Sequence, residues 1–237
     1  MKSINVLTIT LTTIVATVIS SSNCQAQLVP LGGGEVTLDF NEAELGLAGI
    51  SITSVSSDVT TSGPTFDILT FDINSRDDAN PTTFEYTVAT VTPVSGTVET
   101  AGSISFTAPA SGSSSIGNIQ FGFDATRVDV GTGISGFFAQ STTGDFTGIL
   151  FDIGGGFSVV AEETNFSFSD TIFLSDDFST FLLGNDAAGG TDIGTFAIEA
   201  TAVAVPEPAG LACCAFFGIA MTLRRRRKAL LKKTAGQ

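Results

Sequence analysis

Apolar and polar residues alternate along most of the chain, in short segments separated by turn-forming residues. A period of two residues is typical of β-strands with one face buried and the other in water. Turn signals lie between the segments, at Ser62 to Pro64, Asp77 to Pro81, Ser111 to Ser113 and Gly154 to Gly156. We expect strands at Val36 to Phe40, Phe66 to Ile73, Phe84 to Val91, Ile104 to Phe106, Ile119 to Phe123, Phe146 to Ile153, Phe157 to Val160, Phe166 to Phe168 and Phe196 to Val203.

Helical periodicity is nearly absent, and only Asn41 to Leu47 is compatible with one short turn of helix. Many strands at a spacing of roughly ten residues predict an all-β fold, an antiparallel β-sandwich of jelly-roll-like type, for residues 27–204. Phe is the main large apolar residue, with 20 copies in the chain. The single tyrosine, Tyr86, alternates with Phe84 and Val88, so we expect it in the core.

Residues 1–26 are typical of a cleavable secretory signal peptide. Lys2 precedes an apolar run from Ile4 to Ile19, and small residues at Cys24 and Ala26 fit the positions before a cleavage site. We therefore expect cleavage after Ala26. A buried N-terminal strand is one alternative, because Thr, Val and Ile favour strands. A lipidated Cys24 is another, which the residues just before it disfavour.

The C-terminal segment has three consecutive parts. They are the motif Val205, Pro206, Glu207 and Pro208, the uncharged run Ala209 to Leu223, and the basic cluster Arg224, Arg225, Arg226, Arg227 and Lys228. A helix of 15 residues spans about 22 Å, short of a hydrocarbon core of about 30 Å, and snorkelling arginines close the gap. The basic cluster would remain in the cytoplasm, together with a tail at 229–237.

This order of parts resembles the PEP-CTERM sorting signal of exported bacterial proteins, over residues 205–228. The resemblance implies that a membrane-embedded exosortase recognises Pro206, Glu207 and Pro208 and processes the protein there. It also implies an inner-membrane-anchored precursor, then a cell-envelope or extracellular protein in an exopolysaccharide-rich matrix. The tail after the basic cluster is longer than is usual for such signals. An ordinary C-terminal membrane anchor is the alternative.

Charge is strongly segregated along the chain. The whole chain carries −14, but residues 27–205 hold 23 acidic side chains against only Arg76 and Arg127. This acidic part excludes a nucleic-acid backbone as partner, because like charges repel. Cys24, Cys213 and Cys214 lie outside it, so no disulfide can hold the predicted domain together.

The supply of catalytic groups is poor, and we expect no enzymatic activity. The chain has no His, and every Lys lies in the N-terminal or the C-terminal segment. Ser–His and Ser–Lys pairs are therefore unavailable in the domain. Only carboxylate pairs remain, which could hydrolyse glycosides, with candidates at Glu162, Glu163, Asp176 and Asp177. Residues Gly131 to Gly136 match a dinucleotide-binding spacing, but the helix that this motif requires does not follow. Phe137 to Gly144 come next, with another predicted strand behind them, which indicates a glycine-rich β-turn region.

Oxygen-rich loops offer the only metal candidates. Calcium takes carboxylate and carbonyl oxygens, which Asp77, Asp78 and Asn80 could supply, as could the loop from Asp186 to Asp192. Neither has EF-hand spacing, and a solvated acidic loop is the alternative. We expect no other cofactor or metal.

Together these features predict an exported structural or adhesive protein of an exopolysaccharide-rich matrix. The alternative is a carbohydrate-binding module, with or without the help of calcium, although binding platforms for sugars usually use Trp or Tyr. A carboxylate-based glycoside hydrolase is a third and less favoured class.

Overall fold

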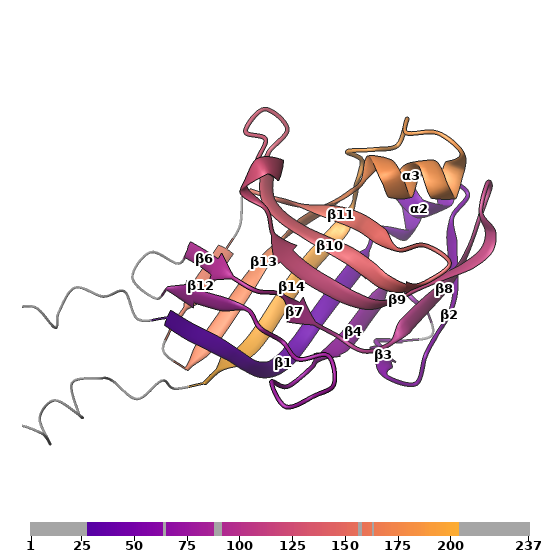
Figure 1. Ribbon diagram of the computed structural model, residues 1–237. Coiled ribbons are helices and arrows are strands. Elements are labelled where there is room, and N and C mark those ends of the chain that lie inside the picture. The colour runs from indigo at the N-terminus through magenta and orange to yellow at the C-terminus, as the bar shows by residue number, and fades with distance from the viewer. Residues whose placement is uncertain (1–27, 64, 88–91, 156–157, 163, 204–237) are drawn as a thin grey trace, which may run out of the picture. The chain divides into compact units, whose positions relative to one another are not determined.

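β-strands make up most of the described chain. The computed structural model describes residues 28–63, 65–87, 92–155, 158–162 and 164–203 (Figure 1). Their strands are β1 Leu28–Phe40, β2 Ser51–Val55, β3 Val59–Thr61, β4 Ile68–Ile73, β5 Glu85–Thr87, β6 Thr92–Ser95, β7 Val98–Glu99, β8 Ser103–Ala108, β9 Gly112–Phe123, β10 Ile134–Gly144, β11 Gly148–Gly154, β12 Ser158–Ala161, β13 Asn165–Leu174 and β14 Asp192–Ala202. The helices are α2 Glu42–Leu47, the 3-10 turn η1 Ala125–Arg127, and α3 Asp176–Leu183.

The strands belong to one antiparallel sheet with the order β2-β8-β9-β10-β11-β13-β14-β1-β4-β3. Its first and last strands, β2 and β3, are consecutive in the chain, and an isolated bridge joins Ile73 at the end of β4 to Thr100 after β7. Since β7 in turn pairs with β9, the sheet curls over and nearly closes on itself.

The predicted all-β, antiparallel class is confirmed. The structure differs from the predicted jelly-roll-like sandwich because its two packed layers are halves of one sheet. Strands β8 to β11 also pair in the order in which they occur in the chain. Such consecutive pairing needs only short connections and favours a single curled sheet.

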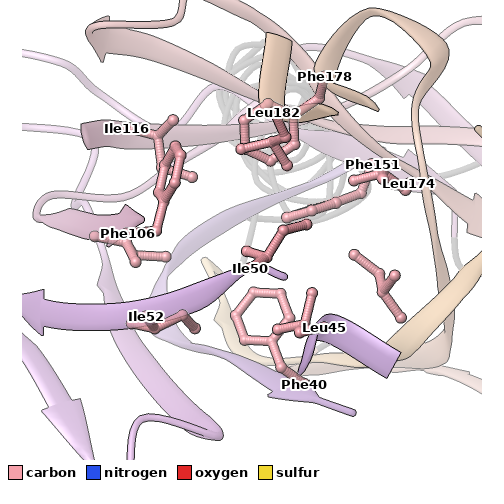
Figure 2. A pocket seen from close by; sticks show the side chains of 12 residues that line it. Phe40, Leu45, Ile50, Ile52, Phe106, Ile116, Phe151, Leu174, Phe178 and Leu182 are labelled. Carbon is pink, nitrogen blue, oxygen red and sulfur yellow. The ribbon is translucent and has the colours of Figure 1, made fainter. Parts of the chain in front are cut away.

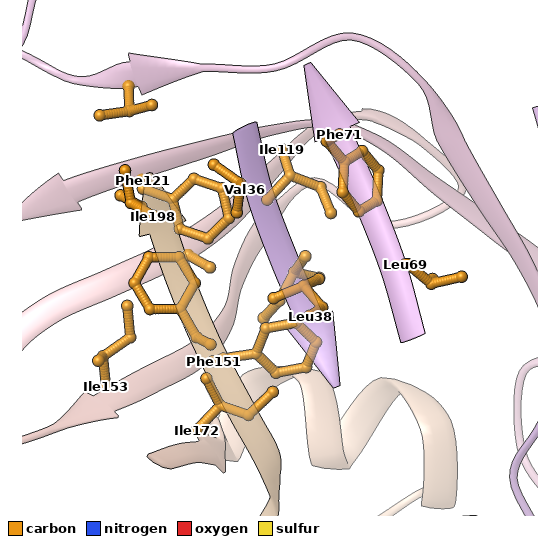
Figure 3. Close-up of a cluster of buried hydrophobic side chains, with 14 of the residues drawn as sticks. Val36, Leu38, Leu69, Phe71, Ile119, Phe121, Phe151, Ile153, Ile172 and Ile198 are labelled. Atoms are coloured by element: carbon orange, nitrogen blue, oxygen red, sulfur yellow. The ribbon is translucent and has the colours of Figure 1, made fainter. Parts of the chain in front are cut away.

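The core lies inside the curl, where inward-facing residues of opposite halves meet (Figure 3). In β1, Val36, Leu38 and Phe40 are buried while Asp39 faces water, as the alternation predicted. Rings from facing halves touch, with Phe121 and Phe196 4.8 Å apart between centroids. Full burial of each such side chain contributes about 1.5–3 kcal/mol, so the core stabilises the domain without a disulfide.

Two glycines allow β1 and β14 to approach closely. Gly34 and Gly194 have positive φ angles of +138° and +145°. A Cβ at Gly34 would lie 2.2 Å from the carbonyl oxygen of Glu199, and one at Gly194 would lie 2.1 Å from that of Asp39. A larger residue at either position would therefore push the paired strands apart.

The two α-helices lie at one end of the curled sheet (Figure 1). The helix α2 was predicted, and Asn41 caps it by accepting hydrogen bonds from the N–H groups of Ala43 and Glu44. The helix α3 was not predicted. Neither of these helices is long and apolar enough to cross a bilayer. The predicted signal peptide, the motif at 205–208 and the span at 209–223 lie outside the described residues.

Candidate functional site

A polar cleft of about 470 Å³ lies beside α3 and is the site on which we concentrate. Its walls come from the turn that precedes β10, from β11, from the end of β13 and from α3 with the loop that follows it. The residues that line it are Arg127, Asp129, Thr132, Ile134, Ile149, Asp152, Phe173, Leu174, Ser175, Asp176, Asp177, Gly189 and Gly190. The volume lies within the range of pockets that hold small ligands.

An ion pair joins two walls of the polar cleft. The side chain of Asp124 caps η1 by accepting from the N–H of Thr126, and this short turn carries Arg127. Arg127 donates from both Nε, at 3.0 Å, and Nη2, at 2.6 Å, to Oδ1 of Asp152 on β11. The side chains of Arg127 and Asp152 are 30% and 12% exposed. Such partial burial strengthens the pair relative to one in open solvent.

One carboxylate oxygen of Asp152 accepts no hydrogen bond from the described residues. The residue is only 8% exposed, which is rare for an aspartate. Both contacts from Arg127 fall on Oδ1, and none of the described residues donates a hydrogen bond to Oδ2. Oδ2 is also not enclosed in the protein. The cleft therefore contains a nearly buried acceptor that a ligand can reach.

Asp129 forms the outer wall within the glycine-rich turn. An isolated bridge between Asp129 and Ile134 closes this turn. The predicted turn is confirmed for residues 131–133, whereas Ile134 to Gly136 already belong to strand β10. The N–H of Gly131 donates to Oδ1 of Asp129 at 2.8 Å. This bond, followed by one from Thr132, lowers the pKa of Asp129 below its usual 3.8. Asp129 therefore carries its charge at any mildly acidic or neutral pH.

The helix α3 brings two more carboxylates to the cleft. Its first turn contains Asp176 and Asp177, where negative charge stabilises a helix through its dipole. Ser175 caps the helix by accepting from the N–H of Phe178 at 3.1 Å. Gly189 lies close to Asp176, and a Cβ at Gly189 would lie 1.9 Å from the Oδ1 of Asp176, so a larger residue there would displace this carboxylate. No described basic residue pairs with Asp176 or Asp177.

Apolar side chains complete the lining. Ile134, Ile149 and Phe173 are half-buried and line the polar cleft beside the charged groups. The hydroxyl of Thr132 and the guanidinium of Arg127 are donors, whereas the carboxylates are acceptors. The site can therefore hydrogen-bond a polyhydroxylated or amine-bearing molecule while covering its apolar face.

A second cavity lies in the core between the helices and the sheet (Figure 2). It is lined by Phe40, Leu45, Ile50, Ile52, Ile104, Phe106, Ile116, Phe151, Leu174, Phe178, Leu182 and Ile193, all of them apolar. Its volume is about 30 Å³, room for little more than a water molecule, and no polar group could bind one. We interpret it as a packing defect of the core.

A second group of carboxylates lies on the outer face of the sheet. Glu35 on β1 pairs directly with Glu199 on β14 and with Asp72 on β4, and all three are exposed. We call this row the acidic rung. Among the described residues the only cations are Arg76 and Arg127, and each pairs with another acid, Glu85 or Asp152.

The proposed calcium ligands lie in the loop between β4 and β5. Asp78 accepts from the N–H of Ser75 at 2.6 Å, and Asn74 donates to the carbonyl oxygen of Asn80 at 2.9 Å. Asp77, Asp78 and Asn80 are exposed. Over the described ranges, no three acidic, His or Cys side chains come together as a metal site would require. Calcium binding remains a prediction.

The remaining predicted site residues fall into two groups. The cleavage site at Ala26, the motif Val205 to Pro208 and the cluster Arg224 to Lys228 lie outside the described residues. Tyr86 is 1% exposed, and its hydroxyl donates to the carbonyl oxygen of Glu162 at 2.7 Å, so its predicted core position is confirmed.

Sequence reasoning missed the polar cleft, although it named part of its lining. Asp176 and Asp177 were singled out only as carboxylate candidates, and Gly131 to Gly136 only as a turn. Ser175 followed by two acids, with Gly184 as a left-handed cap, is a helix signal that could have located α3. The pairing of Arg127 with Asp152 has no comparable signal in the sequence.

Comparison with solved structures shows a distant structural similarity, whereas the sequence comparisons find no match. No protein-family model matches the chain, and no curated protein sequence does. The C-terminal domain of HtaA from Corynebacterium glutamicum is similar in structure, with a TM-score of 0.48 and 17% sequence identity. The match covers 74% of this chain and 99% of that domain. We draw no conclusion about function from a similarity at this level.

Proposed function

We propose that this chain is an exported protein of the cell envelope or extracellular matrix, sorted by an exosortase, with a structural or adhesive role. The observation that carries the proposal is the order of three parts: the motif at Pro206 to Pro208, the apolar run, and the basic cluster from Arg224. An acidic, disulfide-free β-domain precedes them, and its lack of His and Lys supports binding and not catalysis.

The basic cluster gives the precursor its orientation. Positive residues after an apolar run stay on the cytoplasmic side, which places the acidic domain on the other side of the inner membrane. Cutting near Pro206 to Pro208 would then separate the domain from its anchor. The released part would lose the basic cluster and keep a net charge close to −21.

Cell fractionation tests this delivery. A variant that combines Glu207→Ala with deletion of residues 224–227 should be mis-sorted, so that the normal release of the cut domain is lost. The matched control is Glu44→Ala, which removes one exposed carboxylate from α2 and leaves the sorting segment intact. Normal release of the sorting variant would refute the proposal.

A carbohydrate-binding module is the second candidate, and the polar cleft favours it. The cleft combines donors, acceptors and half-buried apolar side chains, as the binding of a sugar requires. A panel of oligosaccharides tested with calcium and then with a chelator would show whether binding occurs and whether calcium assists it. Failure of every oligosaccharide would remove this candidate and leave the sorting proposal untouched.

A further inference from the structure

We propose that the polar cleft binds an amine-bearing polysaccharide, a polymer whose sugar units carry both hydroxyl groups and protonated amines. The inference rests on the carbohydrate-binding candidate above and specifies its ligand class. Three features of the cleft lead to it: its charge, the Oδ2 of Asp152 to which no described residue donates, and the apolar side chains beside the acceptors.

The charge of the cleft selects against anionic ligands. Four aspartates line it, and its one cation, Arg127, is already paired with Asp152. This leaves Asp129, Asp176 and Asp177 without a basic partner among the described residues. An acidic polysaccharide would be repelled here, whereas a protonated amine would be attracted.

Asp152 offers a site for such an amine in the cleft. Its Oδ2 is an acceptor on a residue that is only 8% exposed, and no described residue donates to it. Hydrogen bonds from an ammonium group to a carboxylate are about twice as strong as neutral ones. Arg127 holds the carboxylate in place, so a ligand finds this acceptor already oriented.

The lining of the cleft favours a sugar over a basic peptide. A lysine-rich segment would use only the carboxylates and would leave the apolar side chains of the cleft uncovered. The hydroxyl of Thr132 donates to the carbonyl oxygen of Asp129 at 3.4 Å, so a sugar hydroxyl can donate to Thr132 Oγ1 and to an aspartate. The C–H face of a sugar ring can also cover Phe173 and Ile149, which are half-buried.

Isothermal titration of the full-length protein, purified in detergent, tests the inference. The probes are oligomers of glucosamine at mildly acidic pH and the same oligomers after complete N-acetylation, which removes the charge and keeps the sugar backbone. Glucose oligomers and polylysine complete the set. We expect glucosamine oligomers to bind about tenfold more tightly than N-acetylated ones, because each close ion pair contributes strongly.

Two variants of equal charge separate the cleft from the general acidity of the surface. Asp129→Asn with Asp177→Asn changes the cleft, while Glu35→Gln with Asp72→Asn changes the acidic rung. We expect about tenfold weaker binding for the first and less than twofold change for the second. Asp177→Asn alone, on an exposed residue of α3, serves if the double cleft variant fails to fold.

The outcomes are distinct. Equal loss in both variants would assign binding to overall acidity and overturn the inference, as would tighter binding of polylysine than of any sugar. Equal binding of N-acetylated and glucose oligomers, lost only in the cleft variant, would overturn the amine preference but keep the carbohydrate-binding function. Absence of all binding would overturn both, while the fractionation experiment would still decide the sorting proposal.

Discussion

The polar cleft and the acidic rung both contain several carboxylates. They differ in whether a carboxylate is buried and in whether a described cation pairs with it. In the cleft, Asp152 is nearly buried and bound by Arg127 at 2.6 Å. In the rung, Glu199, Glu35 and Asp72 lie side by side on a sheet face in open solvent, and none of them pairs with a described cation. In the cleft, Arg127 pairs with Asp152, whereas in the rung the carboxylates remain unpaired among the described residues.

This difference shows that acidity alone does not define a site in a chain so rich in carboxylates. Exposed charges are screened by salt over about 8–10 Å, so the rung interacts weakly with any partner. Asp152 is screened less because it is only 8% exposed and half-buried apolar side chains lie beside it, whereas the other three aspartates of the cleft are exposed. Burial and a fixed ion pair therefore distinguish Asp152 from the acids of the rung.

Removing Arg127 should cause the largest change. The variant Arg127→Met leaves Asp152 nearly buried without its partner, and we expect a loss of about 2 kcal/mol in the free energy of unfolding. Urea-induced unfolding measures it. The exposed pair of Arg76 and Glu85, at 3.4 Å, provides the control, since Glu85→Gln should cost less than about 1 kcal/mol.

A double variant sharpens this result. Arg127→Met with Asp152→Leu removes both charges, so no unpaired carboxylate remains, and we expect stability within about 1 kcal/mol of the parent. If the double variant were as unstable as Arg127→Met alone, the cost would come from lost packing around Arg127 and not from the unpaired charge of Asp152.

The strands that the sequence predicted have mostly Phe, Ile, Leu or Val at their inward positions, whereas the short strands β2 and β3 were missed. The segment at Phe66 to Ile73 became β4, and that at Phe196 to Val203 became part of β14. Strand β10 was missed because Ala139 and Ser141 occupy buried positions and shifts in register against β11 interrupt its alternation. The start of β9 was also missed, because Gly112 and Ser113 belong to the stretch Ser111 to Ser113 that the sequence predicts as a turn. Whether such segments form strands depends on their pairing with neighbouring strands, and the local sequence pattern does not show it.

The candidate site was less predictable than the fold, for a physical reason. Arg127 and Asp152 are 25 residues apart, and only the pairing of β10 with β11 and the cap by Asp124 bring them together. Asp176 and Asp177 were visible as acids but could not be told from the other carboxylates of the domain. Enclosure is a property of the assembled sheet, so the sequence pattern carries no signal for it.

Removing one charge from the acidic rung should have a smaller effect of opposite sign. Glu35 is directly opposite two other acids, and like charges opposite each other destabilise a sheet. We expect Glu35→Gln to stabilise the protein by about 0.5 kcal/mol in urea unfolding at low salt, and added salt should reduce this gain. As a control, Glu44→Gln removes a favourable charge from the first turn of α2 and should not stabilise. Destabilisation by Glu35→Gln at low salt would contradict the description of the rung as uncompensated.

The smallest expected change concerns the ionisation of the cleft itself. The pKa of Asp129 is lowered first by the N–H of Gly131 and then by Thr132, so Thr132→Val should raise this pKa only part of the way towards 3.8. Because the folded pKa is depressed, the stabilisation that Asp129 provides is present above its unfolded pKa and is lost as the pH falls through the folded value. Titration of the side-chain carboxyl carbons by NMR measures the shift, with Asp124, whose pKa is lowered by Thr126, as an internal reference that should not move. An unchanged pKa of Asp129 would assign its full depression to the backbone N–H groups of the turn.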